Sequence, residues 1–177
     1  MSSVSSIVKR FNLKPKKFYT NTIIHNFFDS IDNEYKSYLL GFFIADGSIY
    51  SDKRTNGRFS INNSEDDKEI VKAFKKYLKI PSDIQIVNCK LGCKHRKPQW
   101  RIRWTSSYMK NIFEKRYNIH QKKTIDTNFE FPFKLIPKNL QRHFVRGFID
   151  GDGYIGNNGC KNNFSISIVG TSEIFLK

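Results

Sequence analysis

The 177-residue chain has few cysteines, few acidic side chains and no long apolar run. Its three cysteines are an odd number, which argues against a disulfide framework and for a reducing compartment. No apolar run approaches the roughly 20 residues that span a bilayer. The amino terminus also lacks a secretory pattern. We therefore expect an intracellular protein with no membrane partner, in the cytoplasm, the nucleus or an organelle, with a phage or virus as an alternative source.

The shortage of acidic residues leaves a large positive charge. Only 16 Asp and Glu stand against 31 Lys and Arg, so the formal net charge is +15. Such an excess predicts association with a polyanion, and nucleic acid is the usual one. A basic surface that only solubilises the protein is the alternative. The aromatic content of 15% indicates a folded globular chain rather than a disordered one.

The cysteines raise the question of a metal site. Cys89, Cys93 and His95 lie close together in the sequence and could form half of a zinc site. No second pair completes it, because Cys160 lies far along the chain. We interpret these residues as an ordinary part of a hairpin.

Two segments of the sequence are nearly the same. Leu39–Gly47 reads LLGFFIADG and Val145–Gly153 reads VRGFIDGDG, so each apolar run ends in aspartate and glycine. The second aspartate, Asp152, follows Asp46 by 106 residues, and Phe-Ser-Ile recurs downstream of both. This self-similarity indicates an internal duplication.

The spacing of apolar residues and turn signals predicts the same order of elements after each motif. We expect a helix over residues 32–45, a hairpin of strands 48–52 and 58–62, and a helix that follows Ser64. A second hairpin of strands 83–90 and 99–105 and a helix that ends near Tyr117 complete the first unit. The class is α+β. The expected organisation is a basic arm over 1–31, a first unit over 32–118, a linker over 119–137, and an incomplete second unit over 138–177.

The motif helices carry small residues at helical spacing. Small side chains let two helix backbones approach closely. If these stripes meet, Asp46 and Asp152 become neighbours at one end of the helix pair. Two carboxylates there suit Mg²⁺ or Mn²⁺, although a lone Asp-Gly is usually only a helix-ending turn. The predicted interface residues are Gly41, Ala45, Gly147 and Gly151.

The strands predict a second functional surface. Apolar and polar residues alternate along 58–62 and 99–105, so one face of the sheet is polar and basic. Its side chains are of the types that read base edges or contact phosphates, although a solvated sheet face is the alternative. The predicted DNA-binding residues are Arg58, Ser60, Asn62, Lys94, Arg96, Lys97, Gln99, Arg101, Arg103 and Thr105.

Both motifs resemble those of the LAGLIDADG homing endonucleases, and the second is similar to the two-motif, dodecapeptide branch. The resemblance implies a pseudo-symmetric, duplicated αββαββα fold that sits as a saddle in the major groove of double-stranded DNA. It also implies divalent-metal-dependent hydrolysis of specific sites, with Asp46 and Asp152 as catalytic and metal-binding residues. Lys123 is a candidate for the basic residue near the scissile phosphates. Residue 1 is neither Cys nor Ser and no terminal His-Asn is present, so protein splicing is not expected.

Two other interpretations stay open. A non-cleaving nucleic-acid-binding protein, such as a maturase that binds intron RNA or a DNA-binding regulator, could use the same scaffold. An inactive endonuclease fragment is the other, because the second unit lacks its last two strands. We expect a monomer if the chain is complete, and otherwise weak cleavage until a further segment or a second chain completes the saddle.

Overall fold

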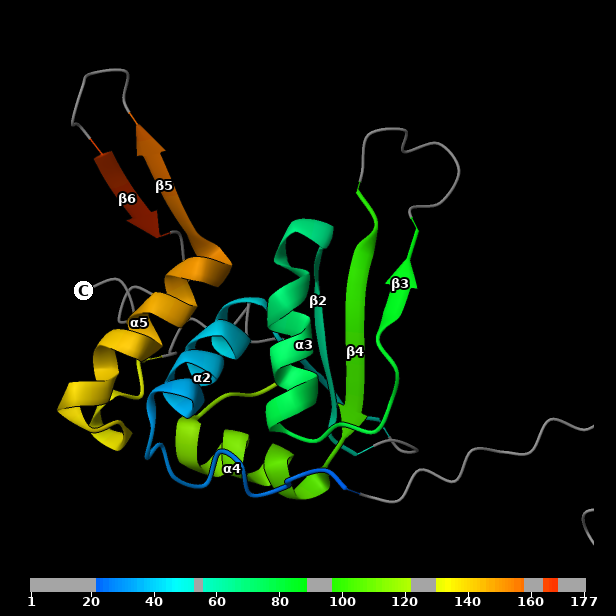
Figure 1. The fold of residues 1–177 in the computed structure, drawn as a ribbon. Coiled ribbons are helices and arrows are strands. Elements are labelled where there is room, and N and C mark those ends of the chain that lie inside the picture. The colour runs from blue at the N-terminus through cyan, green and yellow to red at the C-terminus, as the bar shows by residue number, and fades with distance from the viewer. Residues whose placement is uncertain (1–21, 53–55, 89–96, 122–129, 158–163, 169–177) are drawn as a thin grey trace, which may run out of the picture.

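A computed structural model describes residues 22–52, 56–88, 97–121, 130–157 and 164–168 (Figure 1). The first unit comprises α2 (Glu34–Asp46), β1 (Ser48–Tyr50), β2 (Arg58–Ser64), η1 (Glu65–Asp67), α3 (Lys68–Tyr77), β3 (Gln85–Val87), β4 (Gln99–Thr105) and α4 (Ser107–Tyr117). The remainder comprises η3 (Phe133–Leu135), α5 (Lys138–Asp152), β5 (Gly153–Asn157) and β6 (Phe164–Ile168). The predicted α+β class and the element order of the first unit are confirmed.

The first motif helix, α2, has defined signals at both ends. Asn33 caps its start, because the side chain accepts a hydrogen bond from the Lys36 amide at 3.0 Å. Gly47 ends it in an extended conformation rather than a left-handed one. A Cβ at Gly47 would lie 2.5 Å from the Phe43 carbonyl oxygen, so glycine is needed because the chain turns back closely over the last helical turn. Gly153 ends α5 in the same way, against the carbonyl of Ile149.

Four antiparallel strands form the sheet in the order β1-β2-β4-β3. Strand β2 pairs with β4 over its whole length, from Arg58 opposite Thr105 to Ser64 opposite Gln99. Helices α2 and α3 pack on the face that carries Phe59, Ile61, Ile102 and Trp104, all of which are buried (Figure 1). The opposite face is left for the polar side chains.

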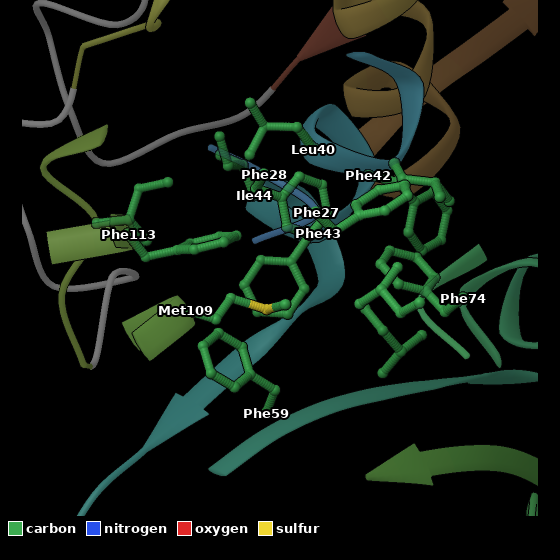
Figure 2. Packing of buried hydrophobic residues seen from close by; sticks show 14 of the residues in the cluster. Phe27, Phe28, Leu40, Phe42, Phe43, Ile44, Phe59, Phe74, Met109 and Phe113 are labelled. Atoms are coloured by element: carbon green, nitrogen blue, oxygen red, sulfur yellow. The ribbon is translucent and has the colours of Figure 1, made fainter. Parts of the chain in front are cut away.

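Aromatic side chains dominate the core of the first unit (Figure 2). Phe43 from α2 lies at its centre, with ring centroids 5.0 Å from Phe113, 5.6 Å from Phe59 and 6.2 Å from Trp104. Such edge-to-face and tilted contacts add to the free energy of burial. Phe43 belongs to the motif itself, so the core holds the motif helix in place.

The chain before α2 packs on this core. Phe27, Phe28 and Ile31 are buried, and the Tyr117 hydroxyl donates a hydrogen bond to the Phe28 carbonyl at 2.7 Å. The basic arm predicted for residues 1–31 is therefore not a solvated arm over residues 22–31. The apolar residues of this segment are buried although it forms only turns, without a helix or a strand. Residues 1–21 lie outside the described part of the chain.

The predicted linker, residues 119–137, also carries packed residues. Ile119 and Ile136 are buried, and the Phe131 ring lies 5.4 Å from both Phe144 and Phe148 of α5. The end of this segment therefore joins α5 to the rest of the core, whereas residues 122–129 lie outside the described part.

Helix α5 continues into the β5–β6 hairpin, which extends away from the first unit (Figure 1). The helix includes Gly151 and Asp152 of the second motif. Ile155 and Ile166 lie opposite each other on the hairpin, and each is 62% exposed. Their counterparts on β1 and β2, Ile49 and Ile61, are buried. No helix in the described residues is long and apolar enough to cross a membrane.

Candidate functional site

The two motif helices, α2 and α5, pack side by side through their glycines (Figure 1). A Cβ at Gly41 would lie 2.1 Å from the Phe144 carbonyl oxygen, and a Cβ at Gly147 would lie 2.1 Å from the Tyr38 carbonyl oxygen. These two contacts are the same contact made twice, because Gly41 and Gly147, like Tyr38 and Phe144, are 106 residues apart. The helices are therefore related by a local two-fold axis, as in an isologous interface.

Polar contacts flank the glycine contacts. The Ser37 hydroxyl donates a hydrogen bond to the Leu140 carbonyl at 2.7 Å, and the Tyr38 hydroxyl donates one to Asp150 at 2.9 Å. Burial and the bond to the Asp150 carboxylate raise the pKa of Tyr38, so this hydroxyl stays protonated at neutral pH. These bonds fix the register of the helix pair.

The small residues continue to the ends of both helices. A Cβ at Gly151 would lie 2.4 Å from the Ala45 Cβ and 3.7 Å from the Asp46 carboxyl carbon. Gly151 is next to Asp152 in the chain, so the motif aspartates occupy the same end of the pair. Gly41, Ala45, Gly147 and Gly151 thus all lie in the helix contact.

The surroundings of the two aspartates differ. Asp46 is partly buried, and its Oδ2 accepts a hydrogen bond from the Asn63 side-chain amide at 3.1 Å. Asp152 is exposed, and no side chain in the described residues hydrogen-bonds its carboxylate. Asn63 is 9% exposed, and its Oδ1 is buried without a hydrogen-bond partner in the described residues.

These groups fit a divalent cation by their chemistry. Both carboxylates and the unpaired Asn63 amide oxygen are hard oxygen donors, which Mg²⁺ prefers, and Mg²⁺ usually keeps several waters besides one or two carboxylates. No group of three or more His, Cys, Asp or Glu side chains that could hold a metal occurs within the described ranges. A site here would therefore need water or phosphate oxygens to complete its coordination.

The sequence did not point to Asn63, because its pattern predicts a strand that ends at residue 62. The strand extends to Ser64, and Asn63 falls on its core-facing side, after Phe59 and Ile61. The signal in the sequence is a polar residue, Asn63, where the alternation of apolar and polar residues along the strand calls for an apolar one. It occurs where the end of α2 meets the sheet.

The open face of the sheet carries most of the predicted DNA-binding residues. The strand pairing aligns them in rows across the sheet. Ser60 lies opposite Arg103, Asn62 opposite Arg101 and Arg58 opposite Thr105, while Gln85 of β3 extends the Arg101 row. Arg58, Asn62, Arg103 and Thr105 are exposed, and Ser60, Gln99 and Arg101 are partly exposed.

Several of these side chains hold one another in place. Arg101 donates a hydrogen bond to Gln85 at 3.1 Å, and Asn62 donates one to Gln99 at 2.9 Å. Arg103 differs, because its guanidinium has no hydrogen bond or ion pair in the described residues. Burial and the neighbouring charges of Arg101 and Arg58 lower the pKa of Arg103, although an arginine stays charged. The three arginines therefore give the open face of the sheet a concentrated positive charge.

The basic loop is only partly described. Lys97 forms an ion pair with Asp66, which raises the pKa of Lys97. The other predicted loop residues lie outside the described part, as do the residues considered for zinc and the candidate basic residue of the linker: Lys94, Arg96, Cys89, Cys93, His95 and Lys123.

Acidic side chains gather elsewhere, on the helical side of the molecule. An open hollow of about 320 Å³ lies between Tyr38, Phe42 and Ile70, and its other lining residues are Asp66, Asp67, Glu69 and Asp150. Four carboxylates would repel phosphate. The hollow on the helical side is therefore acidic, whereas the open sheet face is basic.

The sequence and the fold were compared with known proteins. A family model described as a LAGLIDADG-like domain matches residues 33–121, which are half of the chain. No curated protein matches the sequence.

The chain is similar to solved structures at low sequence identity. The homing endonuclease I-WcaI, bound to its DNA recognition sequence, is 14% identical and superposes with a TM-score of 0.50 over 85% of this chain. The I-LtrWI LAGLIDADG homing endonuclease, bound to target DNA, is 15% identical with a TM-score of 0.43 over 75% of this chain. This chain covers 64% of the length of each of the two. The domain match, together with the paired motif helices, shows that the chain belongs to the LAGLIDADG family.

Proposed function

We propose that the protein is a site-specific endonuclease that hydrolyses double-stranded DNA with the help of a divalent metal. The observation that carries this proposal is the contact of α2 and α5, which brings Asp46 and Asp152 to one end of a helix pair beside a basic sheet. Binding alone requires the basic sheet but not a pair of carboxylates. The DNA-bound homing endonucleases that share the fold support the same assignment.

In this proposal the sheet face binds the major groove. Arg58, Arg101 and Arg103 supply positive charge, and the amides of Asn62 and Gln99 supply donors and acceptors for base edges. Phosphates would contact the flanking basic residues, which sets the position of the DNA without reading its sequence.

The motif aspartates then act on the phosphodiester that lies over the helix ends. Mg²⁺ or Mn²⁺, when bound, supplies Lewis-acid stabilisation of the charge on the phosphate oxygens. Asp46 and Asp152 would hold it, and the Asn63 amide would fix the orientation of the Asp46 carboxylate. The glycine contacts matter because they set the separation of the carboxylates.

The experiment begins with selection of a target from a library of random duplexes, followed by incubation of the selected duplex with the protein. We expect cleavage with Mg²⁺, none with EDTA, and binding without cleavage in Ca²⁺. For variants in which Asp46 or Asp152 is replaced by Asn, Asp83→Asn is the matched control. Asp83 is an exposed carboxylate that pairs with Lys75 outside the site. Selection of no duplex would contradict the proposal.

A non-cleaving DNA- or RNA-binding function is the second candidate. The exposed carboxylate of Asp152, with no hydrogen-bonding side chain in the described residues, favours it, because a working site usually orients its groups. Tight binding without cleavage under any divalent metal would support this alternative. If the protein binds structured RNA more tightly than the selected duplex, its function would be that of a maturase that binds intron RNA.

A further inference from the structure

Asn63 occupies a position where the strand pattern calls for an apolar residue. It lies on the core-facing side of β2, opposite Trp100, and it is 9% exposed. A buried amide is costly unless its groups are paired, so such a residue needs a reason. The Nδ2 group of Asn63 is paired, because it donates a hydrogen bond to the Asp46 carboxylate at 3.1 Å.

The amide oxygen of Asn63 is buried without a hydrogen-bond donor in the described residues. Asn63 therefore both holds one carboxylate and offers an acceptor next to it. A water molecule or a hydrated cation would satisfy that acceptor.

Within the described residues of the second half, no side-chain amide matches Asn63 in the repeat. The sequence repeat matches Asn63 with Ile168, because Phe164 follows the second motif as Phe59 follows the first. Isoleucine has no hydrogen-bonding side chain, and Asp152 is exposed where Asp46 is partly buried.

We propose that Asn63 is a positioning residue for Asp46 alone and that it makes the two halves of the site unequal. The inference rests on the proposed nuclease function. The half that contains Asp46 is preorganised, and preorganised groups lose less when the reacting geometry forms. One DNA strand is therefore cut before the other, and a nicked duplex accumulates.

The first test follows both strands of the selected duplex, each with its own label, in a single turnover with Mg²⁺. We expect the two rate constants to differ by about tenfold or more, which is within the effect of one positioning group. Asn63→Leu keeps the volume but removes the donor, so the faster strand should slow to the rate of the slower one. The slower strand should stay unchanged, and Asn111→Leu, an exposed asparagine on α4 outside the sheet face, is the matched control.

A general structural defect would slow both strands equally and would overturn the inference.

A second measurement does not need cleavage. In the nuclear magnetic resonance spectrum of the whole protein, the Asn63 side-chain amide signals should move in Asp46→Asn and stay in place in Asp152→Asn. If wild-type protein cuts no DNA but these signals behave as expected, the nuclease proposal fails while the positioning contact stands. Signals that respond equally to both substitutions, or to neither, would overturn the role of Asn63.

Discussion

Arg103 is the residue on the sheet face that is best placed to read a base. It is exposed, small serines lie beside it in its row, and its guanidinium is not engaged by described residues. Arginine binds guanine O6 and N7 in a bidentate manner, and this contact discriminates by about 1–3 kcal/mol. Arg101, in contrast, already donates to Gln85.

We therefore expect Arg103→Gln to relax or change the preferred base at one position of the selected site. Affinity for the altered site should fall less than affinity for the original one. Repeating the selection with the variant measures this, and Lys115→Gln on the exposed surface of α4 is the charge-matched control. A uniform loss over all sequences would instead indicate a phosphate contact.

Tyr117 links the stability of the first unit to pH. Burial raises its pKa to about 12, from an ordinary value of about 10. The folded state favours the neutral phenol, so its stabilising contribution is complete below about pH 10 and disappears as the pH rises through about 12. Tyr117→Phe should lower the unfolding free energy at pH 7 by about 1 kcal/mol, through loss of the bond to the Phe28 carbonyl.

The same variant should show a shallower loss of stability between pH 10 and 12 than the wild type. Urea unfolding across that range measures it. An equally steep loss in Tyr117→Phe would show that this tyrosine does not titrate with unfolding, and Tyr38 would then be the group to examine.

At the scale of elements, the contact of α2 with α5 depends on its glycines. A methyl group at Gly41 or Gly147 would lie 2.1 Å from a backbone oxygen of the other helix. Backbone cannot move aside as a side chain does, so the helices must separate.

Gly41→Ala should therefore destabilise the protein by about 1–3 kcal/mol, the usual cost of overpacking, and should reduce cleavage more than DNA binding. Gly156→Ala is the matched control, because its added methyl would meet only the ring of Tyr154, which is 67% exposed and can move. Unfolding curves and cleavage rates of both variants test this. Equal effects of the two substitutions would contradict the helix-contact account.

The sequence predicted the elements where local signals were strong. The alternation in 99–105, the turn before Arg58 and a serine before α4 each specify their structure locally, and Ser106 accepts a hydrogen bond from the Met109 amide. Packing of residues 22–31 and the position of Asn63 depend on contacts between distant segments. Local periodicity cannot reveal such contacts. The helix pair was predictable because the two copies of the motif in the sequence correspond to two equivalent helices in the structure.

For the whole molecule, the charge of +15 predicts strongly salt-dependent binding. Each phosphate neutralised releases counterions, so a protein with six or more phosphate contacts loses about 10³-fold in affinity between 50 and 200 mM salt. We expect a loss of that order for the selected duplex. A fluorescence titration at several salt concentrations measures it, and a flat dependence would argue against binding by the basic sheet.

The central claim is that Asp46 and Asp152, one from each motif helix, form one hydrolytic site. The most direct test compares cleavage of a supercoiled plasmid that carries the selected site by wild type, by each single Asn variant and by Asp46→Asn plus Asp152→Asn. We predict that the double variant binds the site in Ca²⁺ as the wild type does and loses at least about 10²-fold in Mg²⁺-dependent cleavage. Cleavage at the wild-type rate by the double variant would contradict the claim.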